Sequence, residues 1–128
     1  MNIRVVLFGF VIFAFTSAGA AGDKLSVKVS PAVAFAPANL TIRTIVETDP
    51  ENHAVKIAAE SPEFYRSSEI TLEGDRAPRT TTFEFRGLPT GSYEIKATLL
   101  GPGGRQRAMV RQQIEVISSP REDTVRKR

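Results

Sequence analysis

Two runs of alternating apolar residues, separated by a turn sequence, constrain the fold of this chain more than any other feature. In segments 79–86 and 93–99, apolar side chains recur at every second position, and prolyl and glycyl residues fall between the two segments. A period of two is that of a β-strand with one buried face, and not of a helix. We therefore predict two antiparallel strands. Their predicted core residues are Phe83, Phe85, Leu88, Tyr93, Ile95 and Leu99.

The same alternation recurs along most of the chain. It predicts further strands over 25–30, 39–46, 55–59, 68–73 and 107–117. Pro31 places the first of these at a sheet edge, and the apolar residues between Pro31 and Pro37 suggest a short strand that continues this edge after a kink. Gly101-Pro102-Gly103-Gly104 predicts a hairpin turn, and Gln112 suggests a bulge in the last strand. Seven short strands about ten residues apart favour an all-β fold, a two-layer antiparallel β-sandwich with the immunoglobulin-like Greek key.

The first 20 residues have the composition of a secretory signal peptide. Arg4 precedes a charge-free apolar run, 5–15, and Ala18-Gly19-Ala20 fits the small-x-small cleavage rule. The alternative is an uncleaved membrane anchor, but a spanning helix needs about 20 apolar residues. We expect residues 1–20 to be a signal peptide, 21–117 one sandwich domain and 118–128 a disordered charged tail. The mature protein would then be secreted or periplasmic, without stable membrane insertion.

The distribution of charge argues against nucleic-acid binding. The pI is about 9.6, yet segment 21–117 contains 12 Lys and Arg residues and 12 Asp and Glu residues. The excess of basic residues belongs to the two ends of the chain, so no basic face is predicted. The sequence has no cysteine, which excludes disulfides, lipid attachment through cysteine and thiolate chemistry.

The two opening strands and their turn resemble a known family. Their motif consists of Phe83 and Phe85, followed by Leu88, Pro89, Gly91, Tyr93 and Ile95. This pattern resembles the E and F strands of fibronectin type III and related bacterial immunoglobulin-like domains. The carboxypeptidase regulatory-like, transthyretin-type sandwich shows a similar motif and is the alternative topology.

The resemblance implies a structural corner at Leu88, Pro89, Gly91 and Tyr93. In the family, the tyrosine packs under the turn and its hydroxyl bonds to backbone a few residues upstream. Tyr93 matches that tyrosine, and Leu88 matches the buried leucine of the loop. The chain departs from the family because it has no tryptophan, and the aliphatic Val55 stands where many members carry an aromatic residue.

No set of residues predicts catalysis or a cofactor. His53 is the only histidine, in a turn-rich segment, and no nucleophile or second metal ligand is paired with it. We therefore predict a protein that is not an enzyme, with a hydrolase that uses His53 as the alternative. Acidic residues alternate over 47–51 and flank Gly74, which also leaves calcium as an alternative to simple turn-forming carboxylates.

The segment 61–68, predicted to be irregular, contains the best candidate recognition surface. Phe64, Tyr65 and Arg66 are of the residue types that are enriched at binding surfaces. The alternative is that Phe64 belongs to the core and Tyr65 is half-buried. We expect a monomeric module that recognises an unknown protein or glycan. An accessory of an envelope complex that assembles through edge-strand pairing is the second possibility.

Overall fold

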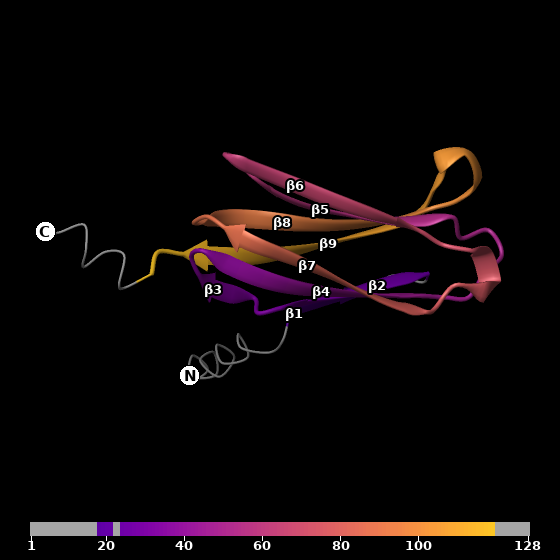
Figure 1. The fold of residues 1–128 in the computed structure, drawn as a ribbon, viewed down its shortest axis with the longest axis horizontal. Helices are drawn as coiled ribbons and strands as arrows, with labels where there is room; N and C mark the ends of the chain where they lie inside the picture. Colours follow the sequence, from indigo (N-terminus) through magenta and orange to yellow (C-terminus); the bar gives the residue numbers. More distant parts are fainter. Residues whose placement is uncertain (1–17, 22–23, 120–128) are drawn as a thin grey trace, which may run out of the picture.

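The computed structural model describes residues 18–21 and 24–119, which form two facing β-sheets (Figure 1). Most of the predicted signal peptide and the predicted disordered tail lie outside the described residues. The strands are β1 Ala18–Ala21, β2 Leu25–Ser30, β3 Val33–Phe35, β4 Ala38–Val46, β5 Ala54–Ser61, β6 Phe64–Thr71, β7 Thr80–Leu88, β8 Gly91–Leu100 and β9 Gln106–Ile117. Among the described residues, the 3₁₀ turns η2 Gly74–Arg76 and η3 Pro102–Gly104 connect strands. Within the described part of the chain, no helix is long and apolar enough to cross a membrane.

The strand order is that of the immunoglobulin-like sandwich. One sheet has the order β1-β2-β4-β7 and the other the order β3-β9-β8-β5-β6. Strands β2, β4 and β7 thus correspond to A, B and E, and β5, β8 and β9 to C, F and G. All pairs are antiparallel except β3 with β9. The predicted two-layer all-β fold is confirmed.

In the full chain β1 pairs with β2 along its outer side, so the strand predicted over 25–30 is at a sheet edge only if residues 1–20, which include most of β1, are removed. Pro31 does end β2, but the apolar segment after it does not continue that edge. It forms β3 in the other sheet, where Phe35 pairs with Ile117. A proline lacks the N–H needed to extend a ladder, so the chain leaves one sheet at Pro31 and joins the other.

The alternating residues form the core between the sheets. All six predicted core residues are buried, with at most 6% of any of them exposed. Val55 and Ile57 of β5, at 1% and 0%, supply the aliphatic contacts of the C-strand position. Thr44 is a buried polar residue on β4, and its hydroxyl donates to the Thr81 carbonyl at 3.2 Å.

The turn between β7 and β8 has the geometry of a tyrosine corner. The Tyr93 hydroxyl donates to the Pro89 carbonyl at 2.7 Å, and both Tyr93 and Leu88 are fully buried. Burial raises the pKa of the Tyr93 hydroxyl, so the neutral, donating form is favoured. A Cβ at Gly91 would lie 3.4 Å from the Tyr93 ring, so the turn packs closely on the aromatic side chain.

Two local predictions are wrong. Segment 61–68 is not irregular, because Pro62 and Glu63 form a tight turn and β6 already begins at Phe64. The bulge in β9 is not at Gln112, which pairs regularly with Ile95. The register instead shifts opposite Leu99 and Leu100, which pair with Ala108 and Gln106, so Arg107 is the extra residue.

Candidate functional site

The structure separates the three residues predicted to form a recognition surface. Because successive side chains of a strand point to opposite faces, Phe64 and Arg66 lie on the inner face of β6 and Tyr65 on the outer face. Phe64 packs edge-on against the Tyr93 ring, with centroids 6.1 Å apart and an interplanar angle of 75°. Arg66 lies over the Phe64 ring and donates to the Arg86 carbonyl at 2.6 Å. Only Tyr65 is free to meet a ligand.

Tyr65 lies beside a hollow on the outer face of the five-stranded sheet. Tyr65 itself is 56% exposed. The hollow has a volume of about 310 Å³ and is formed by β5, β6, β8 and the start of β9. Around Tyr65 it is lined by Lys56, Ala58, Glu60, Glu69, Lys96 and Thr98.

Ala58 forms the floor of this hollow. It is 4% exposed although its side chain is on the outer face, since the longer side chains of neighbouring strands surround it. The sheet register places Ala58 opposite Lys96 of β8, and Glu60 opposite Tyr65 of β6. A methyl group between longer side chains leaves a depression in the sheet. Charged groups of both signs and one aromatic ring therefore border a small apolar floor.

This arrangement suits binding. The Tyr65 ring can stack on an apolar ligand face, while ammonium and carboxylate groups around it donate and accept hydrogen bonds. Lys56 lies opposite Glu69, so positive and negative groups alternate across the strands. The local charge is balanced, which favours a neutral polar ligand over a highly charged one.

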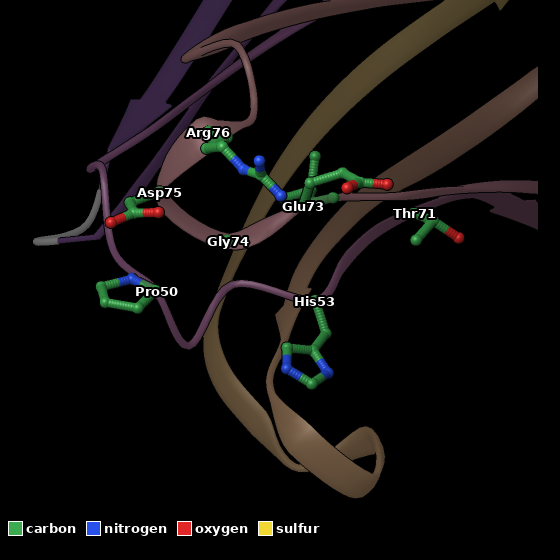
Figure 2. A pocket seen from close by; sticks show the side chains of 8 residues that line it. Pro50, His53, Thr71, Glu73, Gly74, Asp75 and Arg76 are labelled. Atoms are coloured by element: carbon green, nitrogen blue, oxygen red, sulfur yellow. The ribbon is translucent and has the colours of Figure 1, made fainter.

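A second hollow, of about 460 Å³, lies at the loop end of the sandwich and contains the only histidine (Figure 2). His53 is exposed, and in Figure 2 its ring points away from the carboxylates of Glu73 and Asp75. These two carboxylates lie on opposite sides of Gly74. Among residues 18–21 and 24–119, no group of three or more His, Cys, Asp or Glu could hold a metal ion. In the described part of the chain, the loops therefore do not gather the carboxylates of the calcium alternative into a metal site.

A partly buried polar cluster at this end was not predicted from the sequence. Arg107, the bulged residue of β9, has a side chain only 11% exposed and donates to Asn52 and to Asp49, the latter at 3.1 Å. Asn52 is 1% exposed, and its amide donates to the Glu47 carbonyl at 2.9 Å. The cluster ties the β4–β5 loop to the start of β9, so its role is to hold the loops in place.

Backbone groups near the cluster favour the ionised carboxylate of Asp49 and leave room for the side chain of Arg107. The Glu51 amide donates to Asp49 at 2.7 Å and, with the Arg107 guanidinium, holds the pKa of the Asp49 carboxyl below its ordinary value of 3.8. Gly101 leaves room for the arginine, because a Cβ there would lie 2.9 Å from the Arg107 Cδ. The cluster could not be predicted from the sequence, because Arg107 reaches its partners from a bulge that no local sequence pattern indicates.

Comparisons with known proteins show the fold of the chain but do not assign it to a family. No protein-family model matches the chain, and no curated protein matches it. Among solved structures, it is similar to superoxide reductase (neelaredoxin) from Ignicoccus hospitalis, with a TM-score of 0.58, 14% identity, and coverage of 73% of this chain and 80% of the other. A variant of that reductase gives 0.59 at 14% identity, with coverage of 82% and 86%.

A family 76 glycoside hydrolase from a bovine Bacteroides thetaiotaomicron strain is also similar, with a TM-score of 0.52 and 15% identity. The match covers 80% of this chain but 21% of the hydrolase chain. At such identities the likeness shows a common all-β fold alone.

The prediction that the protein is not an enzyme is contradicted by the comparison with superoxide reductase. That protein is an enzyme with the same fold at 14% identity, so the sandwich itself is compatible with catalysis. The prediction assumed that a sandwich without a paired nucleophile and base is a binding module. The same fold in an enzyme shows that this assumption does not hold. The likeness assigns no residue of this chain to the chemistry of the reductase.

Proposed function

We propose that this protein is a secreted or periplasmic recognition module, related in architecture to fibronectin type III domains, that binds a glycan through the hollow beside Tyr65. The observation that carries the proposal is the exposed Tyr65 ring next to the buried methyl floor of Ala58. Sugar rings have one apolar face and a rim of hydroxyls, which match an aromatic surface bordered by hydrogen-bonding groups.

The hydrogen-bonding groups support a polar, uncharged ligand. Lys56 and Lys96 supply donors, and Glu60 and Glu69 supply acceptors around the same floor. The strands that carry them pair in an unbroken register from Glu60 to Ala54, which gives the binding side chains a rigid support. A protein segment with an exposed apolar side chain would satisfy the same groups and is the competing ligand.

A screen of the purified protein on a glycan array, followed by NMR titration of the best ligand, tests this proposal. We expect amide shifts in β5, β6 and β8 around Ala58 and Tyr65. Shifts confined to the loop end around His53 would contradict the proposed site, because that hollow lies on other elements.

A second candidate function is assembly through strand pairing, favoured by the open edge of β6. This strand is eight residues long, contains no proline and has no neighbour on its outer side among the described strands. Its inward-facing Arg66 is a feature that protects edges from pairing, which argues against this candidate. Cross-linking in the native envelope separates the two, because assembly predicts a stable hetero-oligomer and recognition predicts a monomer.

The proposed location rests on the signal-like composition of residues 1–20. Cleavage after Ala20 would leave only Ala21 of β1 attached, and β2 would become the edge of its sheet. Expression in a bacterial host tests this step. A periplasmic product that begins at Ala21 by mass spectrometry is expected, and a product that retains Met1 in the membrane fraction would contradict it.

A further inference from the structure

The hollow beside Tyr65 extends well beyond the tyrosine ring, because its lining continues to Leu100 of β8 and Gln106 of β9. At the near end, Tyr65 pairs with Glu60 of β5. At the far end, Leu100 pairs with Ala54 of the same strand and with Gln106. From Glu60 back to Ala54, β5 rises roughly 20 Å at about 3.3 Å per residue. The hollow is therefore elongated along the strands.

Side chains of two neighbouring strands border the hollow along its length. Tyr65 and Glu69 of β6 lie on one side of β5, and Lys96 and Thr98 of β8 lie on the other. Because a volume of about 310 Å³ extends over this length, the hollow is narrow. A narrow and elongated site fits one extended chain. A branched ligand would have to place its branches over the bordering side chains.

Each end of the hollow offers an apolar surface next to a hydrogen-bonding group. At the near end, the exposed Tyr65 lies opposite Glu60. At the far end, the half-buried Leu100 lies opposite the exposed Gln106. A sugar ring has an apolar face and a rim of hydroxyl groups, so each end can hold one sugar unit. Lys56, between the two ends, can donate to the hydroxyls of the units that join them.

We propose that the hollow binds an unbranched, neutral glycan chain of several units, with one unit held at Tyr65 and another at Gln106. This inference rests on the proposed glycan binding and adds to it the length of the ligand and a second contact. Tyr65 stacks on one sugar ring, and the Gln106 amide hydrogen-bonds to a hydroxyl roughly 20 Å further along the strands. A single sugar occupies one end only and loses the contacts of the other.

Titration calorimetry with neutral, unbranched oligosaccharides tests the proposal on the purified protein. The probes are β-1,4-linked chains of glucose, mannose, galactose and N-acetylglucosamine, each at one, two, four and six units. We expect at least one series to gain about tenfold or more in affinity from one unit to six. Equal affinity for one unit and for six would overturn this proposal and leave the proposed function intact. No binding in any series would overturn it as well, and the proposed function fails with it only if the wider glycan screen is also negative.

Two variants distinguish the far end of the hollow from the near end. Gln106→Ala should weaken binding of the six-unit chain about threefold or more, and so reduce the gain from short to long chains. Tyr65→Ala should weaken binding at every length. Gln113→Ala is the matched control, because Gln113 is an exposed glutamine of the same strand that lies opposite Glu94 and outside the hollow. Equal effects of Gln106→Ala and Gln113→Ala on the six-unit chain would overturn the proposal.

Amide NMR supplies a readout that a purely structural role of Gln106 would not produce. The six-unit chain should shift the amide signals of Leu100 and Gln106, whereas a single unit should shift signals around Tyr65 and Ala58 alone. Shifts confined to the tyrosine end with six units bound would contradict the proposal. Thermal unfolding confirms that each variant is folded, and Thr98→Ala, also at the hollow, replaces Gln106→Ala if the latter is not.

Discussion

The hydroxyl of Tyr93 donates a 2.7 Å hydrogen bond to the carbonyl of Pro89, four residues upstream. This bond closes the turn between β7 and β8 and fixes the aromatic ring beneath it. The ring in turn contacts Phe64 of β6, two strands away in the same sheet. One residue therefore links the corner to the strand that presents Tyr65.

Tyr93→Phe should lower the free energy of unfolding by about 1 kcal/mol or more, because it removes one buried hydrogen bond and keeps the ring. For a domain of this size, that corresponds to a fall in melting temperature of roughly 4–8 °C. Calorimetry measures it. Tyr65→Phe is the control, since the exposed ring makes no comparable buried bond. A thermally silent Tyr93→Phe would contradict the structural role of the corner.

Arg107→Ala should lower the free energy of unfolding by about 1–3 kcal/mol, because it leaves the buried Asn52 oxygen without its donor. Urea denaturation gives the value. Arg111→Ala on the same strand is the matched control, because its ion pair with Glu94 is exposed and should contribute about 0–1 kcal/mol. Similar losses in the two variants would show that burial of the Arg107 cluster adds nothing.

Acid should remove the contribution of Asp49 to stability. Its pKa is lowered in the folded protein, chiefly by the Glu51 amide and then by Arg107. A depressed pKa means that the stabilisation is present above the ordinary value of 3.8 and is lost as the pH falls through the lower folded value. Asp49→Asn should therefore be less stable than wild type at neutral pH and lose less stability on acidification. Melting curves at intervals between neutral and strongly acidic pH test this, and parallel pH profiles for the two proteins would contradict it.

The strands could be predicted because each strand and turn is indicated by residues within its own segment. Phe83 and Tyr93 alternate with polar neighbours, and the turn between them carries its own proline and glycine. Those signals were enough for the two-layer fold, whereas the hydrogen bond at the corner was expected from the resemblance to immunoglobulin-like domains. They could not say which sheet receives β3, because its pairing with β9 joins residues that are about 80 positions apart, such as Phe35 and Ile117.

The candidate site was only partly predictable for the same reason. Tyr65 was named together with Phe64 and Arg66, and a strand divides such neighbours between two faces. The hollow beside Tyr65 depends on Ala58 and Lys96, which the sheet register brings together. The bulge at Arg107 comes just after the hairpin that the glycines predict, but the partners of its side chain, Asn52 and Asp49, lie 55 and 58 positions earlier, so no local pattern marks it.

The central claim is that Tyr65 binds ligand and does not stabilise the fold. Titration calorimetry with the glycan selected by the array, run on wild type, Tyr65→Ala and Tyr65→Phe, tests it most directly. We expect Tyr65→Ala to weaken binding about tenfold or more, equivalent to about 1.4 kcal/mol, with a nearly unchanged melting temperature. Tyr65→Phe should retain most of the affinity, because the ring remains. Unchanged affinity in Tyr65→Ala, or a large fall in its melting temperature, would contradict the account.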